Sequence, residues 1–129
     1  MNLCNHKQSQ GKMNGMCLKL FLVSGMTLLS SVLTAQSLDQ AKKLYNEGKF
    51  EEAKPAFEKL VERTPGNSSY NQWYGVCLYE TGEKEKAEKY LRVAAKRNVQ
   101  EAFRYLGELC YDTYRFEESE EMFQEYIDL

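Results

Sequence analysis

Apolar residues recur along residues 37–129 at the spacing of amphipathic helices. Between Ser68 and Val99 they follow the period of a helix, with one break at Thr81 and Gly82. This pattern predicts two short helices joined by a tight turn. Similar patterns precede and follow this stretch, so we expect this part of the chain to be all-α.

Small and large apolar positions in these helices return with a period near 34 residues. Two sets of small residues and one set of large apolar residues keep spacings of 34 and then 32: Ala41, Gly75 and Gly107; Ala53, Ala87 and Ser119; Phe57, Leu91 and Phe123. Such a period predicts stacked helix–turn–helix units, here at about residues 37–67, 68–99 and 100–129. The small residues leave room for two helices to approach to about 8–9 Å.

Capping signals predict where the helices of the first two units begin and end. The first helix is expected from Ser37 to Glu47, with Gly48 in the left-handed conformation that stops it. The second is expected at Phe50–Arg63, before a Pro-Gly turn. The fourth is expected at about Glu83–Arg97, because its acidic residues come early and its basic residues late.

The third unit departs from the other two at both of its turns. Asn98, with Glu101 three residues later, is expected to cap the start of its first helix. Tyr114 stands where the other units have Gly48 and Gly82. Either this tyrosine is left-handed, at a cost of about 1–2 kcal/mol, or the turn has a different shape.

The motifs of the three units resemble the tetratricopeptide repeat. The resemblance is carried by Tyr74-Gly75-x-x-Leu78 with Ala87-x-x-x-Leu91, and by its counterparts Leu106-Gly107-x-x-Cys110 with Ser119-x-x-x-Phe123 and Ala41-x-x-Leu44 with Ala53-x-x-x-Phe57. It spans residues 37–129, although the early tryptophan of the family is replaced by Ser37, Asn71 and Phe103. The resemblance implies a right-handed α-solenoid.

The chain opens with the features of a secretory signal peptide. An apolar run from Leu20 to Leu33 follows Lys19, and Ala35 precedes a polar residue. The run is shorter than the roughly 20 residues of a transmembrane helix, although an uncleaved anchor stays open as the alternative. We therefore assign residues 1–35 to a signal peptide and residues 36–129 to the repeat domain. Residues 1–15 are a candidate extension that precedes the true start of translation. The expected location is the periplasm or envelope of a Gram-negative bacterium, or the medium.

Charged and catalytic residue types are distributed unevenly. All 19 acidic residues follow residue 35, whereas three basic residues, Lys7, Lys12 and Lys19, precede it. Without a basic stripe, the repeats are not expected to bind nucleic acid. The one histidine, His6, lies in the leader, which excludes histidine-based catalysis and imidazole metal ligation elsewhere. We expect no enzyme activity, no cofactor, no metal and no membrane span after cleavage.

The resemblance implies that the first helix of each unit lines a concave groove that binds peptides. A tyrosine follows the small residue by four positions in every unit, and Trp73 and Tyr105 are expected to form one aromatic wall. The alternative is that these aromatic residues only pack the repeats. The candidate groove residues are Lys42, Tyr45, Gln72, Trp73, Tyr79, Arg104, Tyr105, Glu108 and Tyr111.

A clamp for a partner's C-terminus and a disulfide bond are two further features that the sequence could contain, and neither is favoured. Some family members hold the C-terminus of a partner with a Lys, Asn and Arg clamp; the corresponding positions here keep one lysine among Leu38, Lys42, Trp73, Glu101 and Tyr105. Cys77 and Cys110 fall on successive first helices, whose axes lie about 9 Å apart. A disulfide needs closer Cβ atoms, so two buried free thiols are favoured over a bridge.

The interpretation of these features is a non-enzymatic interaction module that binds a protein or peptide in its groove. The alternative is a scaffold segment that begins a longer cell-envelope protein, whose activity lies downstream. An outward-facing subset of Phe116, Met122 and Ile127 marks the last helix. This apolar surface predicts either end-to-end self-association or cover by further chain.

Cleavage of the leader is directly testable. Mass spectrometry of the protein isolated from the cell envelope should give an N-terminus at or next to Gln36, because the apolar run and Ala35 have the form of a signal peptidase substrate. An intact mass that retains Leu20 to Leu33 would contradict this assignment.

Overall fold

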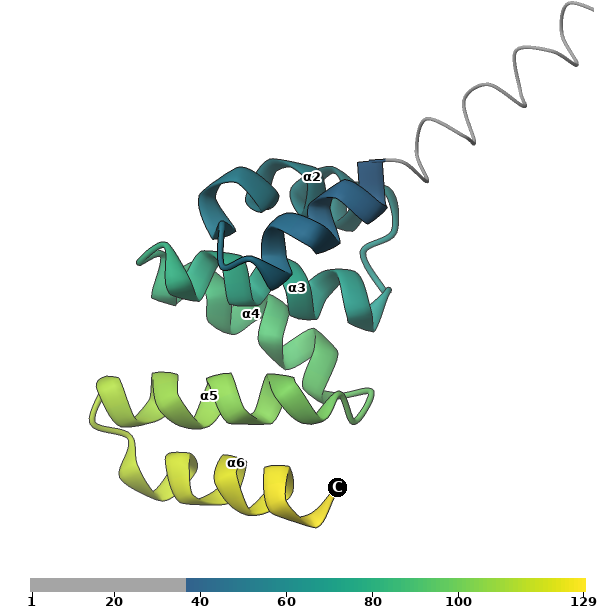
Figure 1. Cartoon of the computed structure of the whole chain (residues 1–129). Coiled ribbons are helices and arrows are strands. Elements are labelled where there is room, and N and C mark those ends of the chain that lie inside the picture. The colour runs from purple at the N-terminus through teal and green to yellow at the C-terminus, as the bar shows by residue number, and fades with distance from the viewer. Residues whose placement is uncertain (1–36) are drawn as a thin grey trace, which may run out of the picture. The chain divides into compact units, whose positions relative to one another are not determined.

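The computed structural model describes residues 37–129, which form six helices arranged as successive antiparallel pairs (Figure 1). The leader expected in residues 1–35 lies outside the described residues. The first helix covers residues 37–46 and is followed by α2 (Phe50–Arg63), α3 (Ser68–Glu80), α4 (Lys84–Ala95), α5 (Gln100–Asp112) and α6 (Phe116–Asp128). The all-α repeat architecture is confirmed. No helix in this described range is long and apolar enough to cross a membrane.

The turn within each helix pair contains a left-handed residue. Gly48 and Gly82 have φ values of 73° and 86°, as their positions predicted, and Tyr114 has a φ of 61°. The third unit therefore keeps the shape of the turn and takes the steric cost of a side chain there.

The junction between α4 and α5 differs from its prediction. Asn98 has a φ of 56° and closes the turn after α4, while Val99 occupies the N-cap position of α5 without a side-chain cap bond. The assignment of Asn98 as a helix N-cap is wrong, because an asparagine tolerates the left-handed conformation that ends a helix as well as the extended one that starts it. Because the turn that closes at Asn98 follows α4, the helix ends at Ala95 and not at Arg97 as predicted.

A buried amide secures the start of α3. The side chain of Asn67 accepts a hydrogen bond from the backbone N–H of Tyr70 at 3.0 Å and caps the helix. The Nδ2 atom of Asn71, which is 1% exposed, donates to the carbonyls of Pro65 and Asn67 at 2.8 and 2.7 Å. The loop before α3 is therefore held by the two hydrogen bonds of Asn71.

Close crossings hold the two helices of the second and third pairs together. A Cβ atom on Gly75 would lie 2.9 Å from the side chain of Leu91, and one on Gly107 would lie 2.7 Å from the ring of Phe123. In the third pair the Oγ of Ser119 also donates to the carbonyl of Gly107 at 2.8 Å. Ser119 therefore fills the small position and satisfies its own buried hydroxyl.

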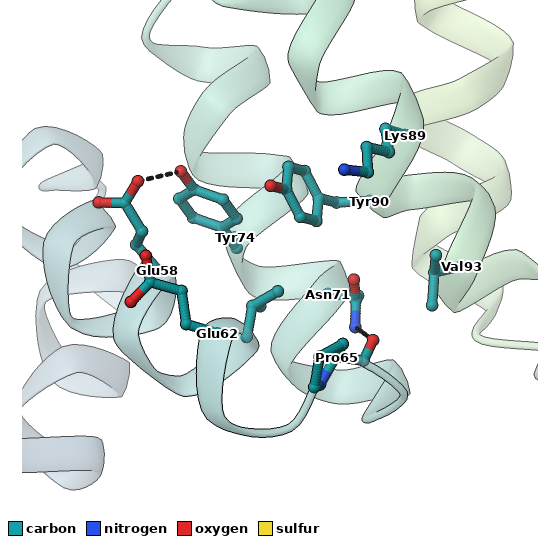
Figure 2. Close-up of a pocket in the computed structure, with 9 residues that line it drawn as sticks. Glu58, Glu62, Pro65, Asn71, Tyr74, Lys89, Tyr90 and Val93 are labelled. Atoms are coloured by element: carbon teal, nitrogen blue, oxygen red, sulfur yellow. Dashed lines mark hydrogen bonds between the residues drawn. The ribbon is translucent and has the colours of Figure 1, made fainter.

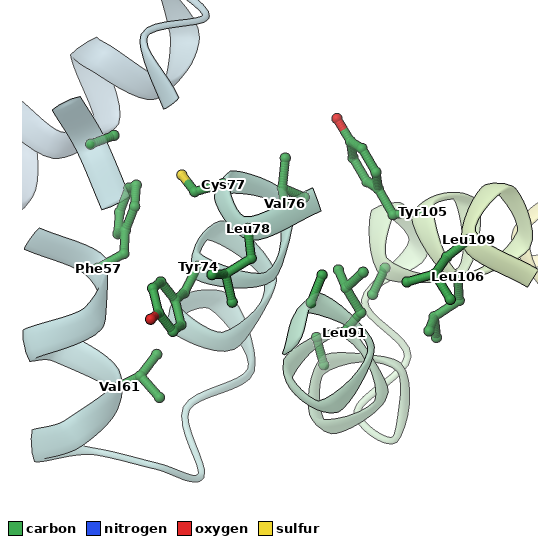
Figure 3. Close-up of a cluster of buried hydrophobic side chains, with 14 of the residues drawn as sticks. Phe57, Val61, Tyr74, Val76, Cys77, Leu78, Leu91, Tyr105, Leu106 and Leu109 are labelled. Atoms are coloured by element: carbon green, nitrogen blue, oxygen red, sulfur yellow. The ribbon is translucent and has the colours of Figure 1, made fainter. Parts of the chain in front are cut away.

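One continuous core runs through the stack (Figure 3). Phe57, Leu78, Leu91, Leu106 and Leu109 are its largest fully buried apolar side chains. Cys77 and Cys110 are free and fully buried, as favoured above, and burial raises the pKa of the Cys77 thiol to about 12. Both thiols act as small apolar side chains.

The crossing at Gly107 gives a direct test of this packing. Gly107→Ala should lower the free energy of unfolding by about 1–3 kcal/mol, because the new methyl group meets the ring of Phe123. Urea denaturation measures the change. The matched control is Gly66→Ala, where an added Cβ has no neighbour within 4 Å; equal losses in both variants would contradict the close-packing account.

Candidate functional site

The first helix of each pair contributes side chains to one common surface, which we call the A-helix face. It combines helix 37–46, α3 and α5, and α3 contacts α5 directly. The A-helix face is defined by Lys42, Tyr45, Gln72, Trp73, Tyr79, Glu80, Glu101, Arg104, Tyr105, Glu108 and Asp112, together with Lys84 of α4, which pairs with Asp112.

Hydrogen bonds between side chains join successive repeats across this face. The Nε2 of Gln72 donates to the hydroxyl of Tyr45 at 3.1 Å. The hydroxyl of Tyr105 donates to Glu80 at 3.0 Å, and that of Tyr79 donates to Asp112 at 3.1 Å. Each bond links residues 25 to 33 positions apart in the chain, so the side chains are held in fixed orientations by the stack itself.

The aromatic side chains of the A-helix face form two separate groups. The ring of Trp73 packs with Phe57 and Tyr70, at centroid distances of 5.5 and 6.1 Å. The ring of Tyr105 packs edge-on against Tyr79 at 5.2 Å. Trp73 and Tyr105 therefore belong to different clusters and do not form the single aromatic wall that was expected.

The exposure of these residues also differs from one to the next. Tyr105 is 6% exposed, because its ring lies under Tyr79 and the side chain of Arg104. For this residue the packing alternative describes the structure. Trp73, Tyr45 and Tyr79 are half-buried, whereas Gln72 is buried. Tyr111 is 62% exposed, packs against Phe116, and takes no part in the hydrogen bonds described above.

Three cations lie over aromatic rings on this surface. The guanidinium of Arg104 lies 4.0 Å from the centroid of Tyr105 and is held by Glu101 and Glu108 at 2.6 Å each. Lys84 lies 4.9 Å from the ring of Tyr79 and pairs with Asp112 at 2.6 Å.

Lys42 is the third cation, and its surroundings are different. Its Nζ lies 4.7 Å from the centroid of Trp73, and it has no carboxylate partner among the side chains of residues 37–129. The A-helix face therefore has one available cation at its first-repeat end. Its third-repeat end holds the carboxylates of Glu80, Glu101, Glu108 and Asp112 around Arg104 and Lys84.

The protonation of the tyrosines suits them to be hydrogen-bond donors. Burial raises the pKa of Tyr105 to about 12 and also raises the pKa values of Tyr45 and Tyr79. Hydrogen bonds from Lys84 and Tyr79 lower the pKa of Asp112. The rings are therefore neutral and the acceptor Asp112 is ionised at physiological pH.

Sequence reasoning placed eight of the nine candidate residues on this common surface and missed two other features. The first is Lys84, which reaches the face from the start of α4. Its position in the sequence does not indicate that it contacts the third repeat. The second feature is a cleft of about 320 Å³ between α2 and α4 (Figure 2).

Side chains that line the α2–α4 cleft already pair with one another. Tyr74 packs edge-on against Tyr90 at 4.7 Å and donates its hydroxyl to Glu58 at 2.9 Å. The corresponding space between α4 and α6 is lined by Arg92, Ala95, Phe103 and Met122, among others. Since the same cleft recurs in the next repeat, it is a feature of stacked helix pairs, and the A-helix face is the better candidate for a specific site.

Comparison with known sequences decides the family. A sequence model described as "Tetratricopeptide repeat" matches residues 38–100, the range of the first two helix pairs and the start of α5. The described chain is a tetratricopeptide repeat domain. A comparison with curated proteins gives no match.

Solved tetratricopeptide repeat structures share this fold at low sequence identity. The type III secretion translocator chaperone SycD of Yersinia enterocolitica is 19% identical, with a TM-score of 0.64 and 72% of each chain covered. The second repeat domain of Spaghetti (RPAP3), solved with the HSP90 peptide SRMEEVD, is 18% identical, with a TM-score of 0.66 and coverage of 74% of this chain and 91% of that one. These likenesses establish the fold of the tetratricopeptide repeat domain.

The raised pKa of Tyr105 predicts how stability depends on pH. The folded-state pKa of about 12 lies above the ordinary value of 10, so its stabilising contribution is complete below about pH 10 and is lost as the pH rises through about 12. Urea denaturation between these limits should show a shallower decline for Tyr105→Phe than for the natural protein. Tyr114→Phe, at an 81% exposed position, is the control; identical curves for all three proteins would contradict the prediction.

Proposed function

We propose that the protein is a non-enzymatic interaction module that holds an extended segment of another protein against its A-helix face. The observation that carries this proposal is the set of cross-repeat hydrogen bonds from Gln72, Tyr79 and Tyr105. They fix the orientation of the surrounding side chains before any partner arrives. A preorganised surface loses little conformational entropy on binding.

The charges of the A-helix face suggest the polarity of the bound segment. Lys42, over the ring of Trp73, offers a cation and an aromatic surface at the first-repeat end. The cations at the other end, Arg104 and Lys84, are already paired with carboxylates. A segment with an acidic group near Lys42 and basic or apolar groups toward α5 complements this distribution.

The same distribution argues against recognition of a partner C-terminus by a basic clamp. Of the positions that correspond to such a clamp, Glu101 carries the opposite charge and Tyr105 is buried. Lys42 alone lacks the several converging donors with which a carboxylate clamp binds. The proposed ligand is therefore an internal segment of a protein.

We also propose that this interaction takes place outside the cytoplasm. The proposal rests on the run from Leu20 to Leu33 between Lys19 and Ala35, and the proposed location is the periplasm or cell envelope of a Gram-negative bacterium, or the medium. Two free buried thiols are compatible with an oxidising compartment because neither is accessible.

The tryptophan of the A-helix face provides the test. Trp73 is the one tryptophan of the chain, so its fluorescence reports on this surface alone. Peptides selected by the protein from a random-sequence display library should change the fluorescence of Trp73 on binding. Lys42→Glu should weaken their binding at least tenfold, about 1.4 kcal/mol. It should change the melting temperature little, because half-buried Lys42 forms no ion pair within residues 37–129.

The matched control for this experiment is Lys89→Glu. Lys89 lies 5.4 Å from the ring of Tyr90 and lines the α2–α4 cleft, so it repeats the lysine–aromatic geometry on another surface. Its variant should bind the selected peptides normally. Binding lost with Lys89→Glu and kept with Lys42→Glu would assign the site to the cleft and reject the proposal.

A further inference from the structure

The α2–α4 cleft and the cleft between α4 and α6 have equivalent positions but opposite charges. The second cleft has a volume of about 250 Å³, and its lining residues stand at repeat positions that also line the first. Glu58 and Glu62 of the α2–α4 cleft correspond to Arg92 and Lys96, 34 residues later. The stacking of helix pairs accounts for the shape of both clefts, but it does not require this inversion of charge.

The aromatic lining distinguishes the α2–α4 cleft further. Its Tyr74 and Tyr90 correspond to Leu106 and Met122 of the second cleft, 32 residues later. In Figure 2 the two tyrosine rings lie between Glu58 on one side and Lys89 on the other. The face of an aromatic ring and a carboxylate both attract a cation. Of these two clefts, the α2–α4 cleft is the one that combines them.

The carboxylates of this cleft are not neutralised by a cation from residues 37–129. Glu58 accepts a hydrogen bond from the neutral hydroxyl of Tyr74 at 2.9 Å. Glu62 is exposed and takes part in no hydrogen bond or ion pair within these residues. Lys89 lies over the ring of Tyr90, at 5.4 Å from its centroid, and forms no ion pair with either glutamate. The cleft therefore has negative charge available on its α2 side.

The apolar part of the cleft fits the stem of a long side chain. Val61, Pro65 and Val93 line it beside the tyrosines. Long basic side chains bury their methylene groups on such surfaces and keep the charged group at the polar rim. The volume of about 320 Å³ is at the lower end of the range for ligand sites, which suits a single side chain.

The rim indicates which cation fits and what carries it. Glu58, Glu62 and Lys89 are all exposed, so the cleft is open along its rim and suits a side chain that is delivered by a larger surface. A guanidinium group stacks on an aromatic ring and divides its donors between two carboxylates, whereas an ammonium group is a compact, strongly hydrated charge. Arginine therefore complements the cleft better than lysine.

We propose that the α2–α4 cleft receives an arginine side chain of a partner protein, with its guanidinium against the tyrosine pair and between the two carboxylates of α2. The groups that contact it are those of Glu58, Glu62, Tyr74 and Tyr90. The cleft shares no residue with the A-helix face, so either proposal can fail without the other.

A blocked tripeptide, alanyl-arginyl-alanine, is the probe. It is added to the natural protein while the NMR signals of Tyr90, Val61 and Val93 are recorded. We expect saturable shifts of these signals. The same tripeptide with citrulline in place of arginine keeps the shape and loses the charge. It should bind at least about fivefold more weakly, because it gains neither the ion pairs nor the cation–ring contact.

Three variants at exposed positions test the charges of the cleft. Glu62→Gln should weaken binding of the arginine peptide about threefold. Lys89→Gln should strengthen it, because a competing cation is removed from Tyr90. Glu52→Gln is the matched control, since Glu52 is an exposed carboxylate of α2 outside the cleft, and it should have no effect. Equal binding of the citrulline peptide, shifts confined to the A-helix face, or equal weakening by Glu52→Gln would overturn the proposal.

Two further measurements identify another occupant. Free arginine that binds as tightly as the blocked tripeptide would show that the cleft takes a small guanidinium compound. Light scattering on the natural protein tests for a second copy: oligomers that are dispersed by both Glu62→Gln and Arg97→Gln would place an arginine of that copy in the cleft. Either result would overturn the assignment to a partner protein, whereas weaker binding of free arginine and no such oligomers are expected.

Discussion

The close approach of two helices at a small residue is the constraint on which the rest of this structure depends. At Gly75 and Gly107 the backbone lies against Leu91 and Phe123 with no space for a methyl group. This contact sets how closely the two helices of the second and third pairs approach. It also sets the register of the next pair, and through that register the cross-repeat bonds of Gln72, Tyr79 and Tyr105.

The A-helix face owes its order to this stacking and little to its own sequence neighbours. Its hydrogen bonds join helices that touch only because the pairs are packed at fixed spacing, so a disturbance of a crossing should loosen the surface at a distance. Tyr105 is a packing residue, whereas Lys42 and Trp73 are half-buried. Binding at this surface stays a prediction.

Much of the fold was predictable because it depends on local signals. The period of 34, the small residues at Gly75 and Gly107 and the left-handed glycines at Gly48 and Gly82 are all visible in the sequence. Asn98 was misassigned because one asparagine can serve either end of a helix, and only the tertiary structure selects between them.

The candidate site was less predictable because equivalent positions have different neighbours. Asp39, Trp73 and Tyr105 share one position of the repeat, yet they are exposed, half-buried and buried. The difference depends on which repeat precedes each of them and on which side chains cover it. The ion pairs of Lys54 with Glu83 and of Glu88 with Arg115 likewise join residues 29 and 27 positions apart. No local sequence pattern predicts such pairs.

The most direct measurement of the central claim is an amide and indole chemical-shift map recorded with a peptide selected by the protein. The account predicts that perturbed signals come from helix 37–46, α3 and α5, with the Trp73 indole among the largest. Perturbations confined to α2, α4 and α6, around Glu58, Tyr90 and Val93, would contradict it, because the ligand would then occupy the α2–α4 cleft and not the A-helix face.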